Sequence, residues 1–316
     1  MDGSSSEPDR RRTEILGPAN SRPTRRTLLT AGAATATAVL TSAAPSHASA
    51  TGHHPDITAR LRALEVQHGA RVGVFAHNLG TRQTIRHRAD ERFPVCSLFK
   101  TLAAAAVLRD LDLGGEVLSK RVHYTADDLV DGSAETEKHL AEGMTVAELA
   151  DVAIRFSDNT AGNLLLRELG GPTAITRFAR SVGDRATRLD RWETELNSAE
   201  PWRHTDTTTP YAIGRTYARL VLGDVLNRPD RELLTHWLLT NTTSGNRFRL
   251  ILPPTWTIAD KTGAGAYGTN NNVGIAWTQN GTPLVLAVQT TKPAQDAAAD
   301  HPLVAETAAV LADALG

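Results

Sequence analysis

The sequence predicts an α/β domain interrupted by an inserted helical domain, with a cleft between the two. Three observations lead to this prediction. A helical pattern and a two-strand hairpin pattern come first, helical patterns fill the middle of the chain, and strand patterns with one more helix close it. Runs of helices between runs of strands are typical of an α+β arrangement. Ligand sites commonly lie in clefts between such domains.

The composition is that of a globular protein with a sizeable core. Its 316 residues suffice for one large domain or two ordinary ones, and 41% of them are hydrophobic. The formal net charge is −1, with no basic block outside the N-terminal region, so nothing indicates nucleic-acid binding. Cys96 is the only cysteine, which excludes an intramolecular disulfide. The histidines show no metal-binding spacing, so we expect neither a metal site nor another cofactor.

Residues 1–50 have the pattern of an export segment. The first 24 residues are polar and lack an apolar period, so we expect disorder there. Arg25 and Arg26 precede a weakly apolar run that ends in the A-x-A pattern Ala48-Ser49-Ala50. The run is too short and too rich in threonine and alanine for a stable membrane anchor. We therefore expect a twin-arginine-like signal, cleavage near Ala50, and a secreted or periplasmic protein.

A helix and a hairpin are the first elements predicted after the export segment. Apolar residues recur at helical spacing over 55–68, and Gly69 ends the pattern. Strand-like stretches at 71–76 and 84–85 predict a β-hairpin.

Helical patterns dominate residues 89–240, which we assign to the inserted domain. The alanine-rich run after Ser97 has high helix propensity and no polar stripe, so this helix should be buried. A capping box at 145–148 opens another helix. Further helices are predicted at 160–169, 172–183, 210–226 and 231–240. Residues 188–209 lack periodicity, and so long a loop tends to be functional.

Strand patterns return near the C-terminus. Residues 256–261 are strand-like, and the stretches 273–277 and 284–288 flank Asn280-Gly281, a strong hairpin signal. A last amphipathic helix is predicted from about 302 to 315. The α/β domain would therefore comprise residues 51–88 and 241–316.

A candidate catalytic pair lies at the start of the buried helix. Ser97 would sit in its first turn, with Lys100 one turn further along the same face. A serine hydroxyl is a weak nucleophile until a base takes its proton, and a partly desolvated lysine can be that base. By itself the S-x-x-K pattern is weak, because a capping serine and a surface lysine explain it more simply.

Three other short motifs could face the same cleft. Ser157-Asp158-Asn159 lies at a helix–helix junction, where its first and third side chains can point the same way. Residues 261–265 (KTGAG) end a strand with a cation, a hydroxyl and a backbone that a ligand can approach closely. Glu193 and Asn197 lie four residues apart in the long loop. Singly, these motifs could be an N-cap cluster, an edge-strand lysine before a turn, and a solvated loop face.

Together, the motifs S-x-x-K, S-D-N, E-x-x-L-N and K-T-G resemble, in order and spacing, those of class A serine β-lactamases. The resemblance covers essentially all of residues 55–316. It implies an α/β/α sandwich with an antiparallel sheet plus an inserted all-helical domain, the serine β-lactamase/DD-peptidase-like fold. It also implies hydrolysis of the amide bond of penicillins and cephalosporins through a serine acyl-enzyme, which confers resistance. The partner would be a β-lactam, and we expect a monomer.

The resemblance also implies how the acyl-enzyme would form. Ser97 would attack the lactam carbonyl, and the backbone N–H groups of Ser97 and Ala264 would bind the oxyanion. Either Lys100, or Glu193 acting through a water, would remove the serine proton; the sequence leaves both open. Ser157 would then pass a proton to the departing nitrogen.

The remaining motif residues would complete turnover. Lys261 would assist Ser157 in the proton transfer, and Glu193 with Asn197 would position and deprotonate the hydrolytic water. The implied substrate-binding residues are Asn159, Asn197, Thr262, Gly263 and Arg247. Arg191 and Asp206 resemble the ion pair that clasps the two ends of the loop in this family.

Three positions depart from common family patterns. Many members carry an arginine at the position of Asn270, whereas others supply it from the preceding loop, as Arg247 would here. Gly132 stands where many relatives have an aromatic wall, so the cleft should be wider or less ordered. Cys96 lacks the partner that some carbapenem-hydrolysing relatives have at the position of Gly265, and we expect it to be a small packing residue.

Three other functions are weighed against the lactamase. A penicillin-binding DD-peptidase shares the nucleophile, lysine and K-T-G motif but is trapped by β-lactams, and it lacks the pair Glu193 and Asn197. A non-catalytic β-lactam sensor would need a membrane-spanning segment to transmit its signal. A serine esterase would need a G-x-S-x-G motif, which is absent.

Overall fold

The computed structural model describes residues 55–316. The predicted export segment, its paired arginines and the expected cleavage near Ala50 lie outside the described residues. The helices are α1 (Pro55–His68), α2 (Phe99–Ala106), α3 (Glu116–Ser119), α4 (Val146–Arg155), α5 (Asn159–Glu168), α6 (Thr173–Ser181), α7 (Pro210–Val221), α8 (Arg228–Leu239), α9 (Phe248–Ile251) and α10 (His301–Leu315). The long strands are β1 (Arg71–Asn78), β2 (Thr84–His87), β7 (Thr257–Gly265), β8 (Thr269–Trp277) and β9 (Pro283–Thr291). The short strands are β3 (Phe93–Pro94), β4 (Arg121–Val122), β5 (Met144–Thr145) and β6 (Thr207–Thr208).

The five long strands form one antiparallel sheet in the order β2-β1-β9-β8-β7. β1 pairs with both β2 and β9, with Val74 opposite His87 on one side and Val288 on the other. At the other edge β7 pairs with β8, with Lys261 opposite Val273. The first hairpin of the chain and its last three strands thus share a single sheet, and the α+β fold class is confirmed.

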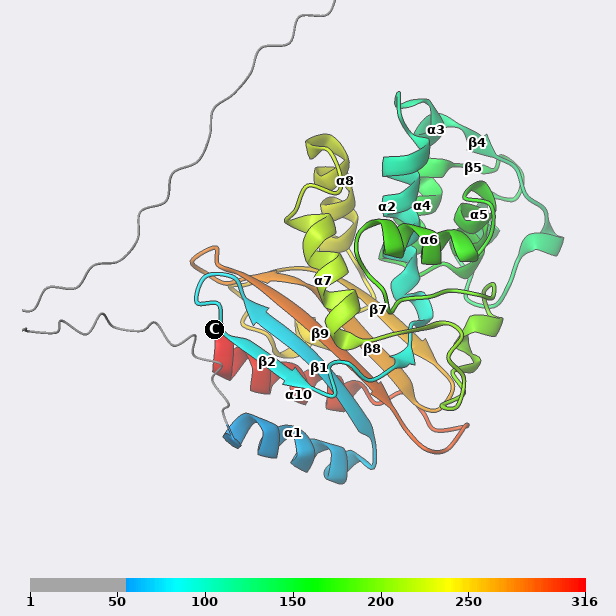
Figure 1. The fold of residues 1–316 in the computed structure, drawn as a ribbon. Helices are drawn as coiled ribbons and strands as arrows, with labels where there is room; N and C mark the ends of the chain where they lie inside the picture. Colours follow the sequence, from blue (N-terminus) through cyan, green and yellow to red (C-terminus); the bar gives the residue numbers. More distant parts are fainter. Residues whose placement is uncertain (1–54) are drawn as a thin grey trace, which may run out of the picture. The chain divides into compact units, whose positions relative to one another are not determined.

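The sheet is covered on both faces, with α1 and α10 on one side and α7, α8 and the helices of the middle of the chain on the other (Figure 1). Side chains of β1 alternate between two cores, as the period of two requires. Val72, Val74 and Ala76 pack in the core formed with α1 and α10. Phe75 packs in the other core, together with Tyr217 of α7. The predicted boundaries of the inserted domain, 89 and 240, remain a prediction.

Helix α2 is the predicted buried helix. Each of its eight residues is buried. It contacts α4, α5, α6 and α8. The run Ala103–Ala106 allows these neighbours to approach closely, because alanine adds almost no side-chain volume. A rigid and fully surrounded helix therefore follows the serine and carries the lysine.

The elements differ from the sequence predictions mainly at their ends. α7 ends at Val221 rather than at Leu226, because Gly223 is a poor helix former. α8 begins at Arg228, earlier than predicted, because the Asn227 side chain accepts a hydrogen bond from Asp230 N and caps the helix. The short helices α3 and α9 and the strands β3 to β6 were not predicted, because elements this short carry no readable periodicity.

Candidate active site

Ser97 lies in a tight 3-10 turn, Cys96–Leu98, that leads directly into α2. Cys96 adopts a φ of 43°, a left-handed conformation that is rare for residues other than glycine and tends to occur at functional sites. Lys100 follows one turn later and donates a 3.0 Å hydrogen bond from Nζ to Ser97 Oγ. Ser97 is 7% exposed and Lys100 is fully buried. The lysine is therefore not a surface residue, and the simpler explanation of the S-x-x-K pattern is wrong.

The ammonium group of Lys100 lies at the centre of the site. Besides Ser97, its Nζ donates to Ser157 O at 2.8 Å and to Asn159 Oδ1 at 2.5 Å. It also lies 3.1 Å from Glu193 Oε1. Burial lowers the pKa of Lys100, while the Glu193 carboxylate acts in the opposite direction. A lysine with a lowered pKa can give up its proton more readily and act as a base.

Glu193 reaches this cluster from the long loop and is 4% exposed. Its Oε2 accepts a 2.5 Å hydrogen bond from Asn197 Nδ2, and its Oε1 lies 3.4 Å from Ser97 Oγ. Asn163 of α5 fixes its backbone twice, with Nδ2 donating to Glu193 O and Oδ1 accepting from Glu193 N, both at 2.9 Å. The structure thus brings the predicted carboxylate–amide pair against the serine–lysine pair.

The loop that carries Glu193 is closed at its base by Arg191 and Asp206. Arg191 Nε lies 2.6 Å from Asp206 Oδ2, and the carboxylate also accepts hydrogen bonds from the backbone N–H groups of Asp190 and Arg191. Asp206 is only 1% exposed. The clasp implied by the family resemblance is therefore present, and it fixes the loop close to Glu193.

The S-D-N motif combines a structural and a site-facing role. Asp158 caps α5 by accepting a hydrogen bond from Ala161 N, so the N-cap interpretation holds for this residue. Ser157 has a φ of 62°, and its Oγ accepts a 2.9 Å hydrogen bond from Lys261 Nζ. Asn159 faces the same site through its contact with Lys100.

Lys261 is the second fully buried cation of the site. Its Nζ donates to Ser157 Oγ and to Thr262 O, each at 2.9 Å. Burial lowers the pKa of Lys261 well below its ordinary value, and the positive charges of Lys100 and Arg247 lower it further. Two buried cations and an arginine at one end of the sheet create a site suited to an anionic ligand.

Strand β7 lies directly against the turn that carries Ser97. A Cβ added at Gly263 would lie 3.2 Å from Cys96 Cβ and 3.3 Å from Ser97 N. Glycine therefore allows the strand to pass close to the turn. Ala264, the next residue in the strand, is exposed. The predicted second oxyanion donor thus belongs to a strand that touches the nucleophile's turn.

The Arg247 side chain extends to Asn270 of β8. Its Nε donates a 2.7 Å hydrogen bond to Asn270 Oδ1, and its Nη1 donates to Thr243 O at 2.6 Å. The Thr243 hydroxyl lies 2.5 Å from that of Thr262. Burial lowers the pKa of Arg247 to about 10, so the side chain stays charged at neutral pH. Arg247 is therefore a buried cation near Thr262 rather than a solvated loop residue.

Arg249, two residues further along the chain, has a structural role. Its guanidinium group lies 2.8 Å from Asp260 Oδ1 and also donates to the carbonyl oxygens of Leu238, Leu239 and Ile258. These contacts connect α8 to β7.

Cys96 and Gly132 both lie next to residues of the site. Burial raises the pKa of the Cys96 thiol, and its Sγ lies 3.0 Å from the point where a Cβ at Gly265 would stand. Cys96 is buried and unpaired, as a packing residue would be. Gly132 has a φ of 79°, and a Cβ there would lie 2.8 Å from Asn159 Nδ2. A larger residue at 132 would thus require a change in backbone or in Asn159.

Sequence reasoning missed the roles of Asn163 and Thr243. Asn163 holds the backbone of Glu193, and Thr243 connects Arg247 with Thr262. Both act through partners distant in the sequence, so no local pattern marks them. Within residues 55–316, no group of three or more His, Cys, Asp or Glu side chains is arranged to hold a metal. No helix in the same range is long and apolar enough to cross a bilayer.

Comparisons with known proteins agree with this geometry. The model of the Beta-lactamase enzyme family matches residues 56–315. A β-lactamase from Streptomyces fradiae is 59% identical over 302 residues, which cover 93% of this chain and 97% of the relative. Another from Streptomyces albus G is 59% identical over 315 residues, covering 95% of this chain and 100% of the relative.

Solved structures extend the agreement to three dimensions. The β-lactamase from Streptomyces albus G matches with a TM-score of 0.82 at 62% identity, over 83% of this chain and all of that one. The class A β-lactamase of the last common ancestor of Gram-negative bacteria matches with a TM-score of 0.79 at 48% identity, over 82% of this chain and 99% of that one. Fold and matches together define a hydrolase of the β-lactamase type. More closely, the chain belongs to the class A β-lactamases, enzymes that hydrolyse the amide bond of β-lactams.

Proposed function

We propose that this chain inactivates penicillins and cephalosporins through an acyl-enzyme on Ser97 that Glu193 helps to hydrolyse. The observation that carries the proposal is the buried cluster in which Glu193 meets Ser97, Lys100 and Asn197. A nucleophile and a base explain acylation alone. A carboxylate, held by an amide beside the same serine, supplies the second base that turnover needs.

In the acylation step, Ser97 Oγ attacks the lactam carbonyl carbon, and the oxyanion is stabilised by the backbone N–H groups of Ser97 and Ala264. The serine proton passes to Lys100, or to Glu193 through a water. Ser157, which accepts a hydrogen bond from Lys261, returns a proton to the lactam nitrogen as the C–N bond breaks. The ring is then open, and the acyl group is an ester of Ser97.

In the deacylation step, Glu193 and Asn197 hold a water, and Glu193 takes its proton as the water attacks the ester. The substrate's carboxylate is bound by Thr262, Lys261 and Arg247, which together offer a hydroxyl and two cations. Asn159 holds the acylamino side chain, and Gly263 lets the substrate lie along β7.

The experiment is to replace Glu193 with glutamine and to follow a chromogenic cephalosporin and benzylpenicillin by absorbance and intact-protein mass. The purified wild-type chain should turn over both substrates with no added metal. Glu193→Gln should acylate and then stall, showing a mass increase that corresponds to bound substrate. Rapid acylation of this variant would identify Lys100 as the acylation base. The matched control is Glu195→Gln, at an exposed loop carboxylate two residues further on, which should turn over normally.

Two results would contradict the proposal. If the wild type released one equivalent of coloured product per enzyme and then stopped, a DD-peptidase or a sensor would be favoured. Normal turnover by Glu193→Gln would show that another group activates the hydrolytic water.

We further propose that the chain is exported, cleaved near Ala50 and active as a monomer, with residues 89–240 forming the inserted domain. The polar start, the paired arginines and the A-x-A pattern support export. N-terminal sequencing of protein secreted from a host with a twin-arginine pathway tests the cleavage site. Light scattering of the same sample tests the oligomeric state.

A further inference from the structure

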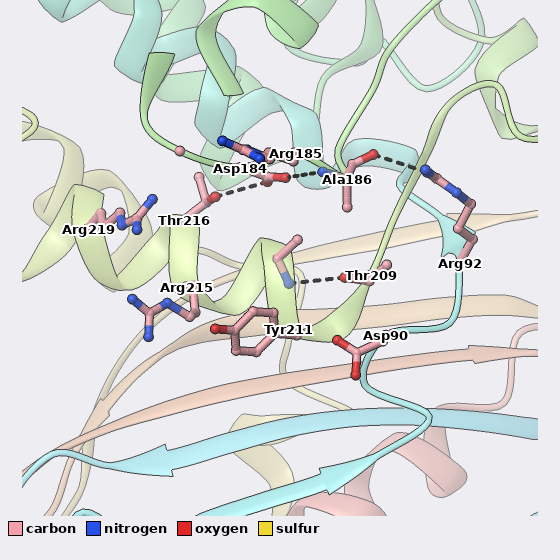
Figure 2. A pocket seen from close by; sticks show the side chains of 12 residues that line it. Asp90, Arg92, Asp184, Arg185, Ala186, Thr209, Tyr211, Arg215, Thr216 and Arg219 are labelled. Atoms are coloured by element: carbon pink, nitrogen blue, oxygen red, sulfur yellow. Dashed lines mark hydrogen bonds between the residues drawn. The ribbon is translucent and has the colours of Figure 1, made fainter. Parts of the chain in front are cut away.

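A pocket of about 450 Å³ lies away from the catalytic cluster. It is bounded by the first turns of α7, by the turn at 183–186 that follows α6, and by the segment 90–92 (Figure 2). None of its lining residues belongs to the site around Ser97. Its volume falls within the range of small-molecule binding sites, about 300–1,000 Å³.

Four arginines line this pocket. They are Arg92, Arg185, Arg215 and Arg219. None of the four forms an ion pair with a carboxylate of the described chain. Arg92 donates to Ala186 O and to Thr207 Oγ1, so it is fixed in place without being neutralised. Arg185 and Arg215 are exposed and have no hydrogen-bond partner within residues 55–316.

The two aspartates in the lining offset only part of this charge. Asp90 is bound by Arg86, which lies outside the lining, at 2.8 and 2.9 Å. The Asp184 carboxylate accepts hydrogen bonds from the backbone of the following turn and from the hydroxyls of Thr187 and Thr216. Both carboxylates thus already have hydrogen-bond partners, and four arginines outnumber them. The pocket is a concentration of positive charge in a chain whose formal net charge is −1.

The arrangement of the arginines disfavours the unliganded state. Arg215 and Arg219 lie four residues apart on α7, where like charges repel. Arg185 comes from the turn after α6, so a second element contributes positive charge to the same cavity (Figure 2). An oxyanion between these elements would relieve the repulsion, because guanidinium groups pair with phosphate and carboxylate through two parallel hydrogen bonds.

We propose that this pocket binds a small oxyanion that carries two or more phosphate or carboxylate groups. The guanidinium groups of Arg185 and Arg215 have free donors that can bind the oxyanion directly. Arg92 and Arg219 supply further positive charge. A ligand with several anionic groups fits better than a single one, because the guanidinium groups come from three separate segments around the cavity. The site is independent of the hydrolytic reaction and of the residue roles proposed for it.

Anion binding should also restrain the base of the loop between α6 and α7, which carries Glu193. Arg92 connects the carbonyl of Ala186 with the hydroxyl of Thr207, and Arg188 N donates to Thr207 O. An anion that holds Arg92 and the 183–186 turn would restrain both ends of this loop. Amide hydrogen exchange should therefore slow at residues 183–190 and 207–211 when the pocket is filled.

The test is isothermal titration calorimetry of the full chain with inorganic pyrophosphate and with citrate, at constant ionic strength set with sodium chloride. We expect saturable binding at one site. Binding of pyrophosphate alone identifies a phosphate ligand, binding of citrate alone identifies a carboxylate ligand, and binding of both identifies a general oxyanion site. Absence of saturable binding by either probe would overturn the proposal.

A pair of double variants localises the binding. Arg185→Gln/Arg215→Gln removes two exposed guanidinium groups from the pocket and should weaken Kd roughly tenfold or more. Arg62→Gln/Arg82→Gln removes two exposed arginines elsewhere and should leave Kd unchanged. Equal weakening in both would show a non-specific charge effect and overturn the proposal. Unchanged turnover of a chromogenic cephalosporin by all variants confirms that each is folded.

Discussion

At the scale of single residues, Arg247 carries the most specific prediction. The guanidinium enters the site from the loop before β7 and is held by Asn270, the position where the family resemblance led us to expect an arginine in many members. Arg247→Ala should lower kcat/KM for carboxylate-bearing β-lactams roughly ten- to hundredfold, mainly through KM, because a buried charge-assisted hydrogen bond to the substrate is lost. Steady-state kinetics with benzylpenicillin and its methyl ester measure the effect.

For the methyl ester, kcat/KM should fall little in Arg247→Ala, because this substrate has no carboxylate to bind. Adding Asn270→Arg to the Arg247→Ala variant places a cation where many relatives have theirs and should restore part of the loss. Equal kinetics of wild type and Arg247→Ala would mean that Lys261 and Thr262 bind the carboxylate without help.

The candidate catalytic residues could be proposed from the sequence because each motif carries its own spacing. Ser97 and Lys100 are one helical turn apart, and Glu193 and Asn197 share one loop. What the sequence could not supply was the pairing between motifs. That Asn163 fixes the Glu193 backbone depends on how α5 meets the loop, and this is a tertiary contact with no local signal.

At the scale of elements, long periodic segments were predicted well and short ones were not. α1 and α4 match their predicted starts, at Pro55 and after Thr145, because the apolar spacing of α1 and the capping box of α4 are visible in the sequence. The strand β6 (Thr207–Thr208) escaped prediction, yet it pairs with β3 directly before the nucleophile turn. Two-residue strands are stabilised by their partner rather than by their own sequence.

The loop between α6 and α7 depends on its clasp. Asp206→Asn would remove the carboxylate charge that faces Arg191. The free energy of unfolding should fall by about 1–3 kcal/mol, because Asp206 is buried and accepts several hydrogen bonds. Glu193 should then be held less firmly, so deacylation should slow roughly tenfold or more while acylation is affected less. Pre-steady-state kinetics, with intact mass as a check for accumulated acyl-enzyme, separate the two steps.

Arg203→Gln is the matched control within the same loop. It breaks the Arg203–Glu200 pair, in which the arginine side chain is 49% exposed and the atoms are 3.2 Å apart, and pairs at the surface contribute about 0–1 kcal/mol. This variant should keep normal turnover. An equal slowing of acylation and deacylation in Asp206→Asn would show that the clasp supports the whole site rather than the position of Glu193.

At the scale of the whole molecule, the site concentrates buried positive charge on one end of the sheet. Among residues 55–316, Lys100 has the Glu193 carboxylate 3.1 Å away, whereas the hydrogen-bond acceptors of Lys261 are a hydroxyl and a carbonyl oxygen. Folding of this part of the chain must therefore desolvate a lysine that gains no carboxylate partner in direct contact. Such a cost is typical of active sites, where stability is given up for reactivity.

This cost makes a prediction about pH. The pKa of Lys261 is lowered by burial and by Lys100 and Arg247, whereas an unfolded lysine titrates near a pKa of about 10.4. Between the folded and unfolded values the unfolded chain binds more protons, so the lysine's contribution to the free energy of unfolding rises with pH. That contribution is fully present above the unfolded pKa and is lost as pH falls through the folded pKa.

Lys261→Met should abolish this dependence. Urea unfolding at pH 7, 8, 9 and 10 measures the free energy of unfolding of both proteins. The difference, wild type minus variant, should rise by about 1 kcal/mol or more across the series, since one proton over one pH unit corresponds to about 1.4 kcal/mol. Lys138→Met, at a lysine whose side chain is 60% exposed, is the control and should follow the wild type in parallel. A constant difference between wild type and Lys261→Met would mean that Lys261 is not destabilised by its surroundings, and that the site holds its second cation without a cost in folding.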